Sequence, residues 1–228
     1  MTTTSAEHGP AATMRRNALA ALPVPMLLGA LLLALAGAPP LIALVLGAAG
    51  WLLALVLRQP IALLVSRRTT PERTATIVGW CSGPAEELVR LALVLLAIRS
   101  TEDALWAGFG WATVEVLLVV VNGIALASLI TKTDAKSLEA RALLEAQGML
   151  GAQQVVWGVL ERVSATAVHI GFTLLLFAQP WLVLVTLPLH SVINMSISRL
   201  AKRHLAATEL VFAAVAAVVL WAGLAVTL

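Results

Sequence analysis

The sequence predicts an all-α polytopic membrane protein, a transmembrane bundle of about seven helices. Of the 228 residues, 60% are apolar and only 12% are charged, whereas soluble domains carry about 25% charged residues. The mean hydropathy is +0.95. Apolar runs close to the ~20 residues that cross a bilayer as a helix recur along the whole chain. These observations exclude an ordinary soluble globular domain.

Seven apolar stretches are predicted to be membrane-spanning helices, and turn signals separate several of them. They cover residues 18–38, 41–57, 75–98, 104–130, 154–178, 180–198 and 207–228. Pro39 and Pro40 end the first, and Pro180 separates the fifth from the sixth, because proline cannot continue a helix. Residues 1–17 are expected to form a disordered cytoplasmic tail and 18–228 a single transmembrane domain. The charged stretch 132–150 is predicted to be a short amphipathic helix.

The first span has one competing interpretation. Arg15 and Arg16, an apolar stretch and the small residues Ala34 and Ala36 also occur in cleaved signal peptides. The apolar stretch is longer than a usual signal-peptide core, which favours a retained helix.

The basic residues give an orientation. Of the fifteen Lys and Arg residues, Arg90 and Arg162 fall inside spans and Arg99 in one connection. The other twelve lie before the first span or after the second, fourth and sixth. By the positive-inside rule the N-terminus is cytoplasmic and the C-terminus is outside. This dispersed distribution favours a membrane lipid partner over nucleic acid, and the single cysteine excludes an internal disulfide or a thiolate metal cage.

Polar side chains inside the predicted spans are the candidate functional residues. A charge at a helix centre opposes insertion by about 2.5–3.5 kcal/mol, so these groups are expected to meet inside the bundle. They are Glu86, Glu87, Arg90, Glu115, Glu161, Arg162, His169, His190 and Asn194. With alternating span directions, most of them fall at a similar depth.

Two imidazoles, a carboxylate and a water form a catalytic zinc pattern, and a second carboxylate can act as general base. Asn194, one turn from His190, can donate a hydrogen bond to a developing oxyanion. Arg90 and Arg162 neutralise surplus acids. The same residues also suit two other functions: a structural polar network that locks the helices together, or a proton relay in a coupled transporter.

Four ordered motifs resemble those of a known family. They are EExxR at 86–90, GxGxxxxE at 108–115, ERxxAxxxH at 161–169 and HxxxN at 190–194. Within residues 77–197 the chain resembles the YhfC family of intramembrane metalloproteases. It is more distantly similar to PrsW and to the superfamily of CAAX prenyl proteases and bacteriocin-processing proteins.

The resemblance implies that Glu86 is the activating base, that His169 and His190 hold zinc, and that Asn194 stabilises the oxyanion. Glu115 stands where the prenyl proteases have histidine, so the third metal ligand is Glu115 or Glu161. We therefore expect a zinc endopeptidase of a bacterial cytoplasmic membrane that cleaves a membrane protein or peptide.

The two adjacent acids of the first motif are predicted to differ in role. Neighbours on a helix diverge by ~100°. The residues that share the face of Glu86 are small or polar, which suits a cavity, whereas Trp80 and Leu91 share that of Glu87. Glu86 is therefore the expected base, and Glu87 is expected to pair with Arg90 or Arg162 and support the site.

Overall fold

The computed structural model describes residues 9–146 and 154–227, and within these ranges the chain is helical with no strand. In chain order the elements are α1 (Pro10–Ala20), α2 (Pro23–Ala36), α3 (Leu41–Ser66), α4 (Pro71–Trp80), α5 (Ser82–Ala97), α6 (Thr101–Leu129), α7 (Ala135–Ala146), α8 (Val155–Ala178), a 3-10 turn η1 (Pro180–Leu182) and α9 (Val183–Thr227). The predicted all-α class is confirmed. The predicted amphipathic helix at 132–150 corresponds to α7, and its last residues lie outside the described ranges.

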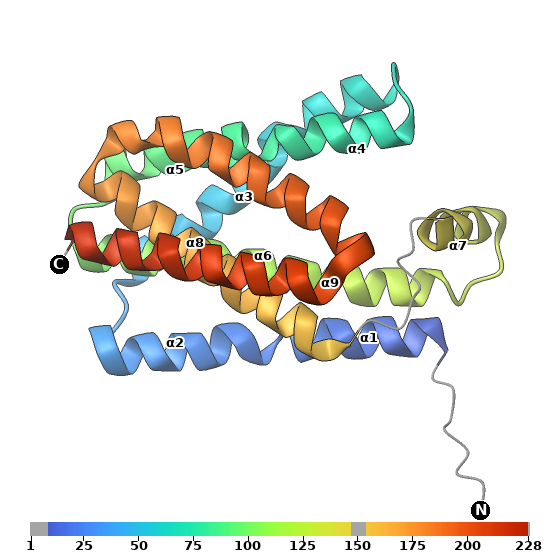
Figure 1. Ribbon diagram of the computed structural model, residues 1–228, viewed down its shortest axis with the longest axis horizontal. Coiled ribbons are helices and arrows are strands. Elements are labelled where there is room, and N and C mark those ends of the chain that lie inside the picture. Colours follow the sequence, from blue (N-terminus) through green and yellow to red (C-terminus); the bar gives the residue numbers. More distant parts are fainter. Residues whose placement is uncertain (1–8, 147–153, 228) are drawn as a thin grey trace, which may run out of the picture.

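Five helical segments of the described chain are long and apolar enough to cross a membrane. They are Pro10–Ala36, Leu41–Ser66, Thr101–Leu129, Val155–Ala178 and Pro180–Thr227. The predicted span 75–98 is divided at Cys81 between α4 and α5, and α5 has only 16 residues, three of them charged. The predicted span 180–198 covers η1 and the first arm of α9, and the described part of 207–228 lies on the second arm. Helix α9 folds back at His204, where φ is −140° and ψ is 56°. Figure 1 shows the resulting hairpin with two antiparallel arms.

Two predicted boundaries differ from the structure. Helix α1 begins at Pro10, so residues 10–17, which we predicted to be a disordered tail, are helical; residues 1–8 lie outside the described ranges. Helix α3 continues to Ser66, although we predicted an end at residue 57. Arg58 therefore lies within a helix and not in a connection, because the helix runs on past its apolar stretch.

The ends of the helices gather at the two ends of the bundle. Figure 1 places the α3–α4 and α6–α7 connections and the tip of the α9 hairpin at one end, together with the start of α1. The α2–α3, α5–α6 and α8–η1 connections and the C-terminus lie at the other. The segments richest in Lys and Arg thus share one end.

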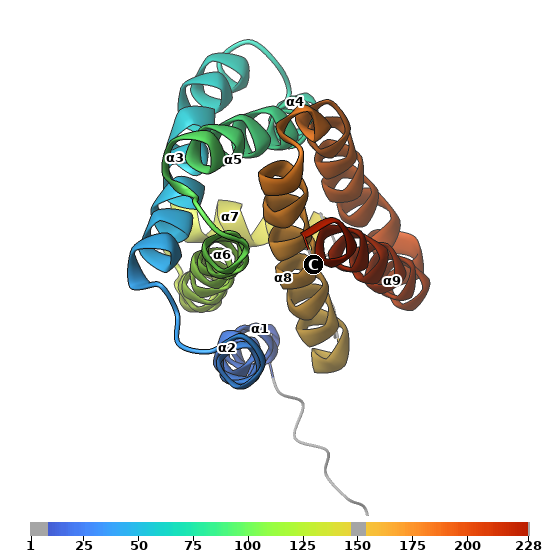
Figure 2. The same ribbon diagram turned by 90° about the vertical axis from the view of Figure 1, so that its left-hand side faces the viewer.

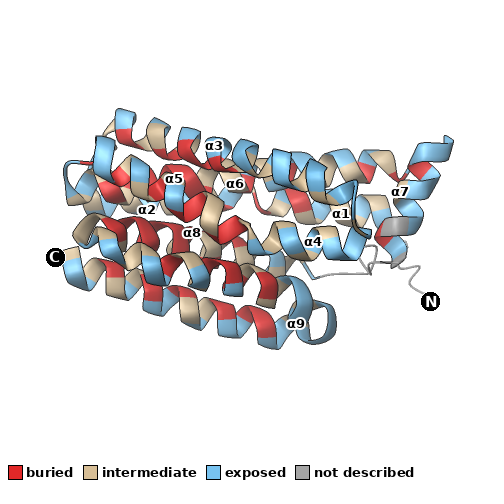
Figure 3. Cartoon of the chain, turned by 90° about the horizontal axis from the view of Figure 1, so that it is seen from above, coloured by how far each residue is buried: buried red, intermediate tan, exposed pale blue. Residues whose placement is uncertain are grey.

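Helix α8 is the centre of the bundle. Seen along the bundle axis, it lies between α6 and α9, with α5 on a third side (Figure 2). In its most apolar stretch 61% of the residues are buried, against 17–28% in the other four candidate spans. Buried residues face inward on the surrounding helices (Figure 3). A side chain on the inner faces of α5, α6 or α9 is therefore directed towards α8.

Two glycines allow the close helix approach that assembles the site. A Cβ added to Gly108 on α6 would lie 2.7 Å from the Cα of Ile170 on α8. A Cβ added to Gly83 on α5 would lie 2.2 Å from the carbonyl oxygen of Leu187 on α9. Since Ile170 and Leu187 are close neighbours of His169 and His190, these contacts set the distance of both imidazoles from the facing helices.

We predict that Gly83→Ala destabilises the folded bundle by about 1–3 kcal/mol, because the new methyl group forces α5 and α9 apart. Gly158→Ala is the matched control: Gly158 is a helical glycine with nothing within 4 Å of an added Cβ, and this change should be neutral or stabilising. Thermal unfolding in detergent measures both. Equal stability of the two variants would contradict the close α5–α9 contact.

Candidate functional site

The guanidinium of Arg90 joins three helices in the interior of the bundle. Arg90 has no exposed surface. Its Nε donates to Glu87 Oε1 at 3.2 Å, and one terminal nitrogen donates to Thr173 Oγ1 at 2.8 Å and to the His169 carbonyl at 3.2 Å. The guanidinium carbon lies 4.1 Å from the ring centre of Trp111 on α6. Arg90 thereby fixes α5 against α6 and α8.

The second terminal nitrogen of Arg90 determines the tautomer of His169. It lies 2.9 Å from His169 Nδ1. Arginine can only donate, so Nδ1 must be the acceptor and the ring carries its proton on Nε2. That Nε2–H donates to Glu115 Oε2 at 2.6 Å. His169 is thus held as a neutral imidazole between a guanidinium and a carboxylate.

His190 has the opposite arrangement. Its Nδ1 lies 2.8 Å from Glu87 Oε1, an oxygen that also accepts from Arg90, so Nδ1–H is the donor. In the neutral ring Nε2 is then the unprotonated nitrogen, and it lies 3.7 Å from Glu86 Oε2. The rings of His169 and His190 are 5.6 Å apart between centroids.

Glu115 and Arg162 extend the network towards the start of α8. Arg162 donates to Glu115 Oε1 at 3.0 Å and also to Glu161 Oε1. Glu161 and Glu115 are partly exposed, with 31% and 21% of the side-chain surface accessible. This end of the network is therefore open, in contrast to Glu87 and Arg90, whose side chains are 0% exposed.

Glu86 has two partners that the sequence did not indicate. Trp111 Nε1 donates to Glu86 Oε2 at 3.3 Å, and a terminal nitrogen of Arg58 lies 3.6 Å from Glu86 Oε1. Arg90, one turn from Glu86, pairs with Glu87 instead. This is one of the two pairings, with Arg90 or with Arg162, that we predicted for Glu87.

A cavity of about 280 Å³ lies beside the network. Eight polar residues contribute to its lining: Arg58, Glu86, Glu115, Glu161, Arg162, His169, His190 and Asn194. Glu87 and Arg90 do not line it and lie behind the histidines. The cavity thus brings together seven of the nine predicted site residues, and the other two orient them.

Asn194 lies at the edge of this cavity. Its Nδ2 donates to Ser82 Oγ at 3.0 Å, and Ser82 in turn donates to the Gly79 carbonyl at 2.7 Å. One N–H of the Asn194 amide is therefore committed to α5. This bond fixes the orientation of the amide against the cavity.

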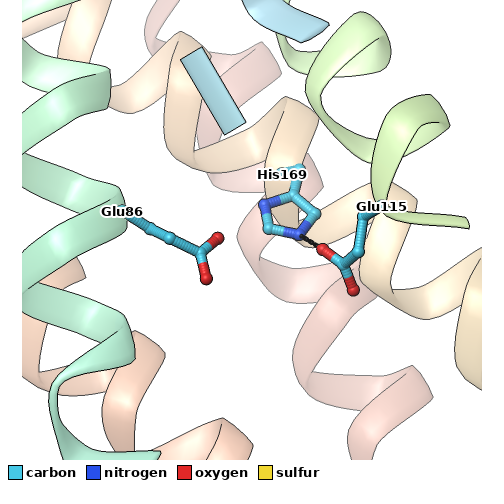
Figure 4. Close-up of side chains that lie close together, drawn as sticks. All are labelled: Glu86, Glu115 and His169. Carbon is cyan, nitrogen blue, oxygen red and sulfur yellow. Dashed lines mark hydrogen bonds and ion pairs between the residues drawn. The ribbon is translucent and has the colours of Figure 1, made fainter. Parts of the chain in front are cut away.

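Three residues offer ligand atoms close enough to share a metal ion: Glu86, Glu115 and His169, with all three atoms within 4.8 Å of one another. Figure 4 shows the three side chains directed towards one another from α5, α6 and α8. His190 is not in this group, and Glu86, the expected base, is. The geometry therefore offers Glu86 as a ligand as well as a base.

Sequence reasoning missed several participants. Arg58 was assigned to a connection, and Trp111 and Thr173 gave no signal because both residue types are common in apolar helices. Glu209, a carboxylate within the predicted seventh span, was a signal that we did not use. It is 2% exposed, and its Oε2 has no hydrogen-bond partner in the described structure.

Comparison of the chain with protein-family models, with curated proteins and with solved structures found no match. The similarity to the YhfC family therefore stays a prediction from the four motifs.

We predict that Arg90→Leu destabilises the protein by about 3–5 kcal/mol, because Glu87 is left as a buried charge without its partner. Replacing both members (Arg90→Leu with Glu87→Leu) should recover a large part of that loss, since no unpaired charge remains. Glu86→Gln is the control at the cavity wall and should unfold close to the wild-type temperature. If Arg90→Leu unfolded like the wild type, the buried pair would not hold the helices together.

Proposed function

We propose that the protein is an intramembrane metal-dependent endopeptidase, with zinc as its metal, that hydrolyses a peptide bond of a membrane-embedded or membrane-associated substrate. The observation that carries the proposal is the polar cavity inside an otherwise apolar bundle, where carboxylates and imidazoles from α5, α6, α8 and α9 converge. Ionisable groups at such a position are expensive to insert and mark functional sites by default.

The charge of the network suits a bound cation. It contains four carboxylates (Glu86, Glu87, Glu115 and Glu161) and three guanidiniums (Arg58, Arg90 and Arg162). With both histidines neutral the sum is −4 + 3 = −1. A divalent metal with a bound hydroxide adds one positive charge and makes the site neutral. A network that only joins helices does not require this net negative charge.

His190 has the arrangement of a metal-bound histidine. Such residues donate one ring N–H to a carboxylate and bind through the other nitrogen, and His190 donates Nδ1–H to Glu87 while its Nε2 faces Glu86 across 3.7 Å. His169 would bind through Nε2, with Glu115 as a further ligand. Since Nε2 carries the ring proton in the metal-free site, His169 would bind in its other neutral tautomer, with the proton on Nδ1, and the Arg90 nitrogen would then have to move away from Nδ1.

The metal would supply a water that ionises at neutral pH. Glu86, on the cavity wall, is placed to take a proton from that water and to pass it to the leaving amine. The second N–H of Asn194 can stabilise the oxyanion. Glu87 and Arg90 hold the two histidine rings in place.

The topology that we propose is seven spans in a bacterial cytoplasmic membrane, with the N-terminus inside. Counting α4 with α5 and each arm of α9 separately gives the seven segments. Eleven of the fifteen Lys and Arg residues lie at the end of the bundle that holds the start of α1 and the α9 hairpin tip. Arg58, which we predicted to lie in a connection at this end, lies within α3 instead. The positive-inside rule assigns that end to the cytoplasm.

A non-catalytic membrane scaffold is the second candidate, and the full burial of Glu87 and Arg90 favours it. A network built only for packing needs no cavity and no metal. Metal content therefore separates the two functions.

We predict that the purified protein binds about one zinc ion per chain and that His190→Ala removes it. His204→Ala is the control, because His204 is exposed at the tip of the α9 hairpin. Imidazole binds metal only in its neutral form, so affinity should fall as the pH drops below ~6.5. Elemental analysis and a competition titration measure both effects. Full zinc content in His190→Ala would show that the site is not the one described.

We predict that Glu86→Gln abolishes cleavage of a transmembrane peptide substrate while zinc is retained, and that Glu87→Gln leaves measurable activity. A lost general base costs roughly 10²–10⁴-fold in rate. Loss of zinc together with activity in Glu86→Gln would make Glu86 a ligand. A more severe defect in Glu87→Gln would reverse the assignment.

A further inference from the structure

A second hollow, of about 390 Å³, lies between the two arms of α9. Nine of its twelve lining residues are apolar. The residues follow each arm at spacings of three and four, so one stripe of each arm faces the other. They are Leu189, Val192, Ile193, Ser196, Ile197 and Leu200 on the first arm, and His204, Ala207, Thr208, Val211, Phe212 and Val215 at the tip and on the second. We call this hollow the α9 groove.

The α9 groove opens outward and adjoins the polar cavity. Val192, Leu200 and Val211 are 46%, 51% and 64% exposed, so the groove reaches the surface that faces the membrane. Ile193, Ile197 and Phe212 line both hollows. Three apolar side chains therefore form a common wall between them.

The length of the groove matches one leaflet of a bilayer. From Leu189 to Leu200 the helix rises about 16 Å, and half of the hydrocarbon core is about 15 Å thick. The tip of the hairpin at His204 would then lie at the level of the lipid headgroups.

A basic collar surrounds this end of the groove. It consists of Arg199, Lys202, Arg203 and His204, all of them exposed. No carboxylate of the described chain forms an ion pair with the three cations. Unpaired Lys and Arg at a membrane surface attract anionic lipids, at about 1 kcal/mol for each residue.

We propose that the α9 groove binds an anionic phospholipid, with an acyl chain between the arms and the phosphate on the basic collar. A peptide fits less well, because each peptide unit carries an N–H and a C=O that need partners. The groove offers few: the Thr208 hydroxyl already donates to the His204 carbonyl at 2.9 Å. A hydrocarbon chain needs none. The bound chain would pack on Ile193, Ile197 and Phe212 and close the membrane-facing side of the polar cavity.

Native mass spectrometry of the full chain, released from detergent after titration with phosphatidylglycerol or phosphatidylcholine, tests the proposal independently of any catalytic activity. We expect one retained phosphatidylglycerol, bound at least tenfold more tightly than phosphatidylcholine. The triple variant Arg199→Gln, Lys202→Gln, Arg203→Gln should lose at least tenfold in affinity, since each charge contributes about fivefold. The triple variant Arg67→Gln, Arg68→Gln, Arg73→Gln removes the same charge near the same end and should keep the binding.

A second pair of matched variants tests the binding of the acyl chain. Val211→Trp fills the groove and should abolish retention, whereas Val218→Trp, on the same arm, outside the groove lining and also 64% exposed, should not. Equal loss in the two charge variants, or equal retention in the two tryptophan variants, would overturn the proposal. So would displacement of the lipid by inorganic phosphate alone, or by an apolar peptide that binds more tightly. Compact charge-state distributions verify folding in the same spectra.

Discussion

The burial of the Arg90 guanidinium is the constraint on which the rest of the site depends. Removing a charge from water costs several kcal/mol, and only good geometry with additional hydrogen bonds offsets that cost. Arg90 meets both conditions through Glu87, Thr173, two atoms of His169 and the face of Trp111. Because these partners come from α5, α6 and α8, the contacts of Arg90 restrict how the three helices can pack. Gly83 and Gly108, at two helix crossings, allow the backbones to approach closely enough for the contacts of the site.

The same interaction makes the two histidines different. Arg90 makes Nδ1 of His169 an acceptor, whereas Glu87, which Arg90 holds in place, makes Nδ1 of His190 a donor. Both imidazoles thus direct Nε2 towards the carboxylates of the cavity wall. This nitrogen carries the proton in His169, whereas in a neutral His190 it does not. The two rings are therefore not equivalent in the metal-free site: one donates a hydrogen bond from Nε2, and the other, when neutral, can accept a proton or bind a cation there.

The sequence predicted the composition of the site better than its contacts. Apolar runs located most of the helices, since burial in lipid leaves a strong signal. The nine candidate residues all line one cavity or contact its histidines. Glu87 was predicted to pair with Arg90 or Arg162, and it pairs with Arg90. The pairing of Glu86 with Arg58 and Trp111 was not predicted, because it depends on how α3 and α6 pack against α5. Arg58 was misplaced because an apolar stretch and a helix need not end together.

Some helix boundaries were predicted wrongly for related reasons. The predicted third span has a break at Cys81, next to the glycine and proline of the Ser82–Ala97 helix, and no average over an apolar window shows such a break. Glu209 lies outside the four motifs, so the family resemblance gave no indication of it. Its burial shows that a single carboxylate in an apolar stretch is itself a signal.

The central claim is that Arg90 sets the protonation of the two site histidines, and ¹⁵N chemical shifts of histidine-labelled, metal-free protein measure this directly. With four histidines in the chain, single His→Gln variants assign the signals. The account predicts that His169 carries its proton on Nε2 and His190 on Nδ1. A His169 protonated on Nδ1, or two histidines with the same tautomer, would contradict it.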